Sequence, residues 1–390
     1  ATVGLFEGKG CSREVRCLAR RISRKPVDGR ASPAQIADSG PVAGSEQGPG
    51  LPLPGRAETV RASKCETRAS REVGTRMSLN GKAYIAGAFE HPTRKAIDKS
   101  LPELHADVAY GALEDAGLSL SDVDGYFCAG DAPGLGPINM VDYLGIKPTF
   151  VDSTDTGGSS YVVHVEHAVQ AIAQGRCKVA LITLAGRPAA EGMATGTAPR
   201  VYNQQAPDVQ FEFPFAPVVT NMYAMAAMRH MHEFGTTSEQ LAWIRVAAST
   251  HAQHNEHAVR REVVTVEDVV NSPMITTPLH RLDCCVISDG GGALVVVHPD
   301  IAKSLKRPLV KVKGCASALK GQDAGQVDLT YTAARFTGPK AFEEAGVKPT
   351  DIKYASIYDS FTITVLLQLE DLGFCEKGEG GKFVSDGNLI

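Results

Sequence analysis

The segment ALEDAGLSLSDV, at residues 112–123, recurs as AFEEAGVKPTDI at residues 341–352, and the offset of 229 residues is constant through the match. Each copy brings a helical pattern to an end at a glycine, the residue most often found after a helix C-terminus. A turn and an acidic residue then lead into an apolar run that predicts a strand, GYFC at 125–128 and YASI at 354–357. Because the tail is shared as well, the match predicts a duplicated α/β unit whose strand ends can face each other across one site.

Around these copies, strand and helix patterns alternate from Met77 onward. Helical spacing of apolar residues runs over 101–116, and a second helix is expected over 161–174. Apolar runs predict buried strands at 82–87, 178–184, 293–297 and 309–312. This alternation predicts an α/β protein in which helices cover largely buried sheets.

Residues 1–76 differ from the rest in charge and in pattern. They carry 14 Lys+Arg against 8 Asp+Glu, whereas the whole chain has 40 against 44. Glycine and proline are frequent and apolar periodicity is weak, so this stretch cannot bury enough surface to offset the entropy lost on ordering. We therefore expect residues 1–76 to be a disordered or non-native N-terminal extension. A nucleic-acid-binding arm is disfavoured because the basic residues form no dense blocks.

Composition excludes several broad classes of protein. The formal net charge of -4 gives no basic field for nucleic acid, and no apolar run approaches the roughly 20 residues that cross a bilayer. The N-terminus shows no secretory signal pattern. Nine cysteines form neither a regular framework nor a CxxC pair, which favours reduced thiols in a cytoplasmic protein.

A turn rich in small polar residues, DSTDTGGSS at 152–160, precedes the second expected helix. Glycines at a helix start let free backbone amides approach a ligand, and the helix dipole favours negative charge there. Gly157, Gly158 and Ser159 are therefore candidates for an active-site loop. The alternative is an ordinary capped helix, with Ser159 or Ser160 as the cap.

A glycine-rich segment, SDGGGA at 288–293, precedes another expected strand. Its glycines indicate close approach of the backbone, either to a ligand or to another chain segment. The candidates that it contributes to the active-site loops are Asp289, Gly290, Gly291 and Gly292.

The polar cluster YDSF at 358–361 ends the expected strand of the second repeat copy. Open α/β sheets gather ligand chemistry at the carboxyl ends of their strands. The Tyr358 phenol can hold or move a proton there if its neighbours lower its pKa from about 10. A half-buried tyrosine with a bonded hydroxyl is the structural alternative.

Metal chemistry is not indicated. His251, His254 and His257 are spaced along a polar helical stretch without the carboxylates of a metal site, and the adjacent Cys284 and Cys285 cannot readily bind one ion. We expect these two cysteines to be small core residues, and we expect no metal. The chain has no GxSxG segment, which argues against an α/β-hydrolase.

Four segments share a pattern with one family: LHRLDC at 279–284, SDG at 288–290, RHMHEFGTT at 229–237 and YDSF at 358–361. Together they resemble the sterol-carrier-protein (lipid-transfer protein) branch of the thiolase superfamily. The resemblance covers nearly everything after Met77 and implies a thiolase fold, two similar βαβ-rich halves in a layered α-β-α-β-α arrangement. It predicts an N-terminal half with an inserted loop region at 77–300 and an incomplete, truncated C-terminal half at 301–390.

Two departures from the family pattern bear on the chemistry. Family thiolases carry an acyl-accepting cysteine in a Cys-Ser-Thr-Gly-Ser-Ser type segment, and anchoring on GSS at 158–160 puts Asp155 in that position. A carboxylate is a weak nucleophile toward a thioester, whereas a thiolate is a strong one. Tyr358 stands where the family has His or Asn, which replaces an oxyanion donor by a group suited to proton transfer.

This combination resembles the thiolase-like aldolases of steroid side-chain degradation. The resemblance implies retro-aldol cleavage of a β-hydroxyacyl-CoA with a steroid or lipid side chain, without a nucleophilic cysteine and with Tyr358 and Asp359 as catalytic candidates. It also implies coenzyme A as part of the substrate, no tightly bound cofactor, a homodimer, and an OB-fold partner subunit that helps to bind the CoA ester. The alternatives are an acetyl-CoA acyltransferase and a non-catalytic subunit that binds acyl-CoA or lipid. The remaining family motifs would follow Ile390, so we expect part of the second catalytic wall beyond that residue.

Overall fold

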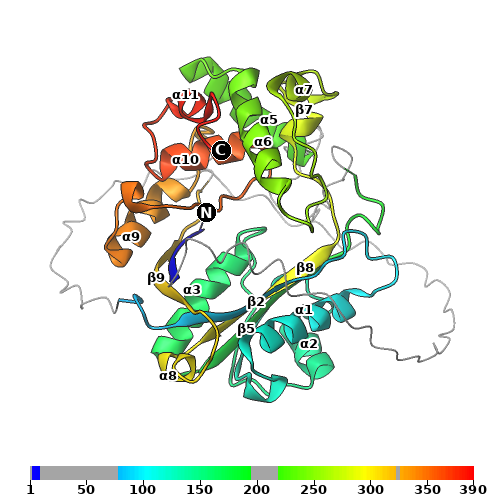
Figure 1. Ribbon diagram of the computed structural model, residues 1–390, viewed down its shortest axis with the longest axis vertical. Coiled ribbons are helices and arrows are strands. Elements are labelled where there is room, and N and C mark those ends of the chain that lie inside the picture. Colours follow the sequence, from blue (N-terminus) through cyan, green and yellow to red (C-terminus); the bar gives the residue numbers. More distant parts are fainter. Residues whose placement is uncertain (1, 9–77, 195–217, 322–325) are drawn as a thin grey trace, which may run out of the picture. The chain divides into compact units, whose positions relative to one another are not determined.

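Strands and helices alternate along the chain as the sequence predicts (Figure 1). The computed structural model describes residues 2–8, 78–194, 218–321 and 326–390. The strands are β1 (Thr2–Gly8), β2 (Tyr84–Glu90), β3 (Gly125–Phe127), β4 (Phe150–Asp152), β5 (Val179–Gly186), β6 (Met274–Thr276), β7 (Leu279–His280), β8 (Gly290–Val297) and β9 (Val310–Ser317). The helices are α1 (Leu101–Ala116), α2 (Pro137–Leu144), α3 (Ser160–Ala173), α5 (Val219–Phe234), α6 (Ser238–Ala252), α7 (Val266–Val270), α8 (Pro299–Ala302), α9 (Ala334–Ala345), α10 (Thr362–Asp371) and α11 (Gly380–Val384). Within the described ranges, every helix is too short or too polar to cross a membrane.

Seven of these strands form one mixed sheet, in the order β1-β9-β2-β8-β5-β3-β4. β3 pairs in parallel with both β4 and β5, and β8 runs antiparallel between β5 and β2. The parallel pairing brings the carboxyl ends of β3 and β4, at Phe127 and Asp152, to one edge of the sheet. The loop that carries Asp155 therefore begins where open α/β sheets place their ligand chemistry.

The two faces of the sheet bury alternate residues of the same strands. Tyr126 and Leu181 pack with α1 and α2 in one hydrophobic core, whereas Phe127 and Ile182 pack with α3 in another. Side chains that follow each other along a strand point to opposite faces, which explains the division. Figure 1 shows α1 and α2 on one side of the sheet and α3 on the other, so the layered α/β arrangement is confirmed.

The repeat in the sequence is also a repeat in the structure. Gly87 of β2 packs so closely on α1 that a Cβ there would lie 2.2 Å from the Ala112 carbonyl oxygen. Gly314 of β9 packs on α9 in the same way, with 2.4 Å from its ideal Cβ to the Ala341 carbonyl oxygen. Ala112 and Ala341 open the two sequence copies, so each half builds its strand–helix pair around the same contact.

The two copies also end alike. The glycine after each helix has a left-handed φ, 71° in the first copy and 67° in the second. The acidic residue two positions before each glycine has the same role in both copies. Asp115 accepts a hydrogen bond from the Ala88 N–H, and Glu344 accepts one from the Cys315 N–H. Each carboxylate ties its helix to the strand beneath it. The duplicated α/β unit expected from the sequence is confirmed.

β1 occupies in the second half the place that β8 occupies in the first. β8 pairs antiparallel with β2, with Val295 opposite Gly87, and the residue before this glycine is left out of the ladder. β1 pairs antiparallel with β9, with Leu5 opposite Gly314, and the residue before that glycine is left out in the same manner. The backbone register thus identifies β1 as the counterpart of β8.

This strand corrects the expectation for the N-terminal stretch 1–76. Thr2–Gly8 are not a disordered extension, because they pair antiparallel along the edge of β9 opposite to the edge that pairs with β2. Local composition could not reveal that partner, which lies some three hundred residues away in the chain. Residues 9–76 lie outside the described part of the protein.

The strand expected at 354–357 is absent. The backbone there has no regular structure, and Tyr354 is exposed. Its counterpart β3 is held between β4 and β5, but the described residues of the second half provide no equivalent neighbours. An extended segment without ladder partners does not form a strand.

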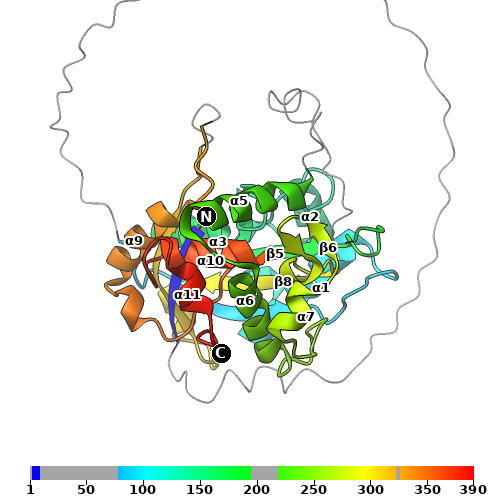
Figure 2. The same cartoon turned by 90° about the horizontal axis from the view of Figure 1, so that it is seen from above.

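A separate core joins the region between β5 and β8 to the second half. It contains Leu241 of α6, Leu279 of β7, Leu366 of α10 and Val384 of α11. Phe361, the last residue of the YDSF segment, is buried in the same core. Seen from above, α5, α6, α10 and α11 gather together (Figure 2). This core therefore fixes one end of the segment that carries Tyr358.

Candidate active site

Asp155 lies in the loop between β4 and α3, where the loop itself fixes its carboxylate. One carboxylate oxygen accepts a hydrogen bond of 2.8 Å from the Gly157 N–H and lies 3.4 Å from the Ser160 hydroxyl oxygen. The other oxygen lies against Gly130, whose ideal Cβ would come within 2.3 Å of it. The side chain is exposed at the N-terminal end of α3, where the helix dipole stabilises a negative charge.

The serines of this loop shape the turn. Ser159 is the N-cap residue of α3, but its side chain makes no capping bond. The Ser160 hydroxyl instead accepts the Thr156 N–H at 2.8 Å and donates to the Gly157 carbonyl at 2.6 Å. Gly157 has a φ of 71°, which favours glycine. Hydrogen bonds of Ser160 therefore hold a turn that exposes Asp155, and this turn differs from an ordinary capped helix start.

Two histidines of α3 support the same loop. His164 is fully buried, and its Nε2 lies 2.9 Å from the Thr154 carbonyl oxygen. His167 pairs with Asp152, which raises the pKa of His167. Burial alone would raise the pKa of Asp152, but the hydrogen bond from His167 lowers it. These contacts hold both ends of the turn that precedes Asp155.

Tyr358 reaches this loop from the second half of the molecule. A Cβ at Gly158 would lie 2.5 Å from the Tyr358 hydroxyl oxygen, so only a glycine admits the phenol there. The tyrosine side chain is about half exposed, and no described residue hydrogen-bonds its hydroxyl. The segments 152–160 and 358–361, which the sequence singled out separately, therefore meet at one place.

The surroundings of Tyr358 favour the protonated phenol over the phenolate. Partial burial raises the pKa of Tyr358, and the ionisation of Tyr223, Cys285 and Asp359 nearby raises it further by opposing another negative charge. The lowered pKa that the sequence analysis required for a base is therefore not found. Tyr358 is a phenol that can donate a proton at neutral pH.

Tyr223, on α5, is a neighbour that the sequence analysis missed. Its ring stacks on Phe361 with 4.2 Å between ring centroids. It lies 135 residues before Tyr358 in a helix whose pattern does not set it apart. No local signal could have identified it.

The described thiols are all held in the protonated form. Burial raises the pKa of each of the six described cysteines, to about 12 for Cys128 and to about 11 for Cys375, and in the same direction for the others, Cys177, Cys284, Cys285 and Cys315. A thiol that keeps its proton is a poor nucleophile. None of the described cysteines therefore has a thiol whose pKa is lowered as an active nucleophile requires.

Cys285 differs from the expectation of a core residue. Its side chain is exposed. Its segment runs beside the YDSF segment, and the Cys285 N–H donates a hydrogen bond to the Ser360 carbonyl at 3.0 Å. Partial burial and the charge of Asp359 raise the pKa of this thiol. Cys285 is thus close to Tyr358 without being activated.

Asp289 serves packing rather than the site. Its carboxylate is 2% exposed and accepts hydrogen bonds from the backbone N–H groups of Ala96, Ala189 and Ala190, at 2.7, 2.7 and 3.0 Å. A carboxylate with its oxygens engaged in this way joins two loops and has little capacity left for a substrate.

The glycines after Asp289 have a packing role too. Gly290, Gly291 and Gly292 open β8, and a Cβ at Gly291 would lie 2.3 Å from the Leu184 carbonyl oxygen of β5. Of the two explanations that the sequence left open, the structure supports close approach of another chain segment.

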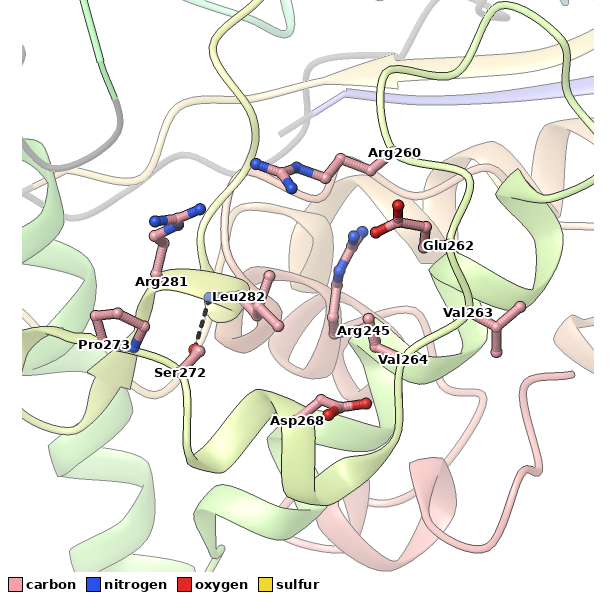
Figure 3. Close-up of a pocket in the computed structure, with 10 residues that line it drawn as sticks. All are labelled: Arg245, Arg260, Glu262, Val263, Val264, Asp268, Ser272, Pro273, Arg281 and Leu282. Atoms are coloured by element: carbon pink, nitrogen blue, oxygen red, sulfur yellow. Dashed lines mark hydrogen bonds between the residues drawn. The ribbon is translucent and has the colours of Figure 1, made fainter.

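Several arginines line a cavity of about 450 Å³ (Figure 3). Arg245 of α6, Arg260 and Arg281 line it, and none of the three forms an ion pair with a described residue. Burial and the charge of Arg260 lower the pKa of Arg245, whereas Asp359 raises it. Cations that repel one another in a partly buried place are stabilised by a bound anion. We call this feature the arginine cavity.

The chain is similar in sequence and in fold to known proteins. Residues 316–390 match the family model described as "Thiolase C-terminal domain-like". The chain is similar to the "Steroid side-chain-cleaving aldolase" of Thermomonospora curvata, at 35% identity over 324 residues, 80% of this chain and 82% of that protein. It is similar to the "Acetyl-CoA acetyltransferase" of Methanothermobacter thermautotrophicus, at 33% identity over 302 residues, 74% of this chain and 76% of that protein. The solved "Ltp2-ChsH2(DUF35) aldolase" superposes with a TM-score of 0.73 at 33% identity, covering 80% of this chain and 82% of that one.

Proposed function

Because this chain belongs to the thiolase superfamily, we propose that it cleaves the carbon–carbon bond of a β-hydroxyacyl-CoA thioester by a retro-aldol reaction. The observation that carries the proposal is the contact between the Tyr358 phenol and the loop that holds Asp155. Where an acyl-accepting thiolate would be needed for acyl transfer, the site presents a carboxylate and a protonated phenol. The name of the Thermomonospora relative supports a steroid or lipid side chain as the acyl group.

The reaction proceeds without an acyl-enzyme. A base takes the proton of the β-hydroxyl, the oxygen–carbon bond becomes the carbonyl of a ketone or aldehyde, and the bond between Cα and Cβ breaks. The electron pair remains on Cα as a thioester enolate. A proton delivered to Cα then completes the shortened acyl-CoA. The two proton transfers balance, so neither an oxidant nor a covalent intermediate is required.

Tyr358 suits the second of these proton transfers. Its raised pKa keeps the phenol protonated at neutral pH, and a protonated acid beside the reacting carbon is what the enolate requires. Asp155 supplies a fixed carboxylate that can accept the hydroxyl proton, although it is a weak nucleophile. In the direction of bond formation the two groups exchange roles.

The arginine cavity suits the phosphate end of coenzyme A. Asp359, which the sequence analysis put among the catalytic candidates, is exposed and close enough to affect the pKa of Arg245. Glu262 and Asp268 also line the cavity, but Asp268 already accepts the Thr265 N–H at the start of α7. Guanidinium groups bind phosphate through paired hydrogen bonds. A CoA ester anchored there would carry its thioester toward Tyr358.

A partner subunit is part of the proposal. The name of the superposed aldolase joins two components, Ltp2 and ChsH2(DUF35). We propose that this chain likewise functions with a second subunit, of OB-fold type, that completes the binding of the CoA ester. We also propose that two copies of the chain form a homodimer.

The decisive test is product analysis. The full chain, alone and with an OB-fold subunit, would be incubated with β-hydroxyacyl-CoA esters, and the released ketone or aldehyde and the shortened acyl-CoA would be quantified. Tyr358→Phe is expected to lower the rate by about 100-fold or more while its far-UV circular dichroism and melting curve stay unchanged. Cys285→Ala removes the exposed thiol beside Tyr358, and alkylating the cysteines of this variant is expected to leave the activity in place.

Other outcomes assign other functions. Radiolabel transferred from acetyl-CoA to a cysteine would identify an acyltransferase of the kind that the Methanothermobacter relative's name describes. Binding of CoA esters without turnover in either direction would identify a non-catalytic binding subunit.

A further inference from the structure

We propose that Tyr223 is a second phenol of the active site and that its hydroxyl hydrogen-bonds the β-oxygen of the substrate. The identity of the substrate rests on the proposed function, whereas the arrangement of the two phenols does not. On this inference Tyr223 distinguishes a β-hydroxyacyl-CoA from the same ester without the β-oxygen.

A stacking contact fixes the position of the Tyr223 ring. Tyr223 and Phe361 lie 4.2 Å apart between centroids, with 28° between their planes. Phe361 is 5% exposed and forms an antiparallel bridge with Cys284, so it is a rigid platform. Because Phe361 follows Tyr358 by three residues, the stack holds Tyr223 against the segment that carries the first phenol. The contact involves the ring and does not depend on the hydroxyl.

The Tyr223 hydroxyl is available to a ligand. The ring is partly buried against the core that α6 and α10 share. Within the described ranges, however, no group forms a hydrogen bond with its oxygen. Tyrosine hydroxyls that are taken out of water normally find a partner. The β-oxygen of a substrate held at Tyr358 would provide that partner.

The two phenols are also near enough to influence each other. Ionisation of Tyr223 raises the pKa of Tyr358, as a second negative charge in the same site must do. Two phenol donors can serve two atoms of a retro-aldol substrate. Tyr358 protonates the enolate carbon, and Tyr223 stabilises the oxygen that becomes the carbonyl of the leaving fragment.

Binding affinities test the contact apart from turnover when every protein compared also carries Tyr358→Phe, which removes the proposed acid. The affinities of 3-hydroxybutyryl-CoA and butyryl-CoA would be measured by calorimetry at neutral pH, for the full chain with Tyr358→Phe alone and for its combinations with Tyr223→Phe and with Tyr110→Phe. Tyr110 is an exposed tyrosine on α1 and serves as the matched control. The Tyr358→Phe chain and the control are expected to prefer the hydroxy ester by about three- to tenfold. Tyr223→Phe is expected to lose this preference while binding butyryl-CoA unchanged.

A titration of the phenol to the phenolate measures the pKa of Tyr358, which a purely structural role of Tyr223 would leave unchanged. The absorbance change on raising the pH would be compared between proteins with Tyr358 and with Tyr358→Phe, so that the difference isolates one phenol. In the Tyr223→Phe background the pKa of Tyr358 is expected to fall, whereas Tyr110→Phe leaves it in place. Should Tyr223→Phe prove unstable, Tyr223→Leu keeps an apolar side chain against Phe361 without a hydrogen-bond donor and is expected to give the same two results.

The outcomes separate this inference from the proposed function. An unchanged preference in Tyr223→Phe, or equal affinities for the two esters in the Tyr358→Phe chain, would overturn the role of Tyr223 even if the protein cleaves β-hydroxyacyl-CoA. A lost preference together with a lowered pKa of Tyr358 would support it even if no cleavage were detected. An unaltered titration of Tyr358 would show that the phenols do not share one site.

Discussion

The hydroxyl oxygen of Tyr358 lies so close to Gly158 that a Cβ at residue 158 would come within 2.5 Å of it. Gly158 stands just before α3 in the first half of the molecule, and Tyr358 stands just before α10 in the second. The duplicated fold therefore forms one site from the starts of two helices. Each half contributes a different group, a carboxylate from Asp155 and a phenol from Tyr358.

Gly158→Ala should block the site while leaving the fold intact. The added methyl group would displace the Tyr358 phenol, because 2.5 Å is far shorter than a van der Waals contact. We expect at least a tenfold loss of cleavage activity, with a melting temperature close to that of the unmodified chain. Gly186→Ala is the control, since its Cβ would meet only Pro188 at an ordinary 3.5 Å. Full activity in Gly158→Ala would show that the phenol contact is dispensable.

The pH dependence of cleavage should show Tyr358 as an acid. Because its pKa is raised, the phenol is protonated and active through neutral pH. It loses its proton only as the pH rises through a value above about 10. We expect the cleavage rate to be flat near neutrality and to fall at the alkaline end, and Tyr358→Phe to lack this fall. A rate that climbs steadily as the phenol ionises would instead identify Tyr358 as a base.

Asp289→Asn should reduce stability rather than chemistry. The side-chain amide group cannot accept the backbone N–H groups that the second carboxylate oxygen now serves. We expect the free energy of unfolding in urea to fall by about 1–3 kcal/mol. Activity per folded molecule is expected to persist at temperatures where the variant remains folded. An inactive but equally stable variant would place Asp289 back among the site residues.

Arg260→Gln should weaken the binding of coenzyme A esters. Removing one guanidinium from the arginine cavity takes away a charged phosphate contact, and we expect the dissociation constant of acetyl-CoA to rise by about tenfold at low salt. Arg261→Gln is the matched control, because this neighbouring arginine donates to the Gln253 carbonyl and does not line the cavity. Equal effects of the two substitutions would mean that the cavity contributes only general positive charge.

The parts of this fold that depend on local pattern could be predicted from the sequence. α1 begins and ends where its apolar spacing and its final glycine place it, at Leu101 and Ala116. The repeat was visible because each copy needs the same small residues for the contact of a strand with a helix, as at Gly87 and Gly314. The sequence singled out the loops 152–160 and 358–361, and the repeat predicted that strand ends of the two halves can face each other across one site.

The parts that depend on distant partners could not be predicted. The stretch 354–357 has the composition of a strand but lacks neighbours among the described residues. The glycines at 290–292 fit close approach of a ligand and close approach of another strand equally well in the sequence. Only the fold shows that the neighbour is β5. Tyr223 and the arginine cavity come from several elements, so no single segment carried their signal.

The raised pKa of Tyr358 also could not be predicted from the sequence. The sequence shows which residue type stands at the end of a segment, but the proton affinity of a phenol depends on what surrounds it. Tyr223 and Cys285, which reinforce that shift, lie far from Tyr358 in the chain. The choice between acid and base therefore became possible only with the folded arrangement.

The antiparallel match between β1 and β9 has a practical consequence for protein production. Starting a recombinant protein at Met77 would leave one edge of β9, Val310–Ser317, without the strand that pairs with it in the described sheet. Bare strand edges recruit other molecules. Such a shortened version would be prone to cross-molecular pairing and precipitation, and supplying the peptide Thr2–Gly8 in trans would be the direct remedy.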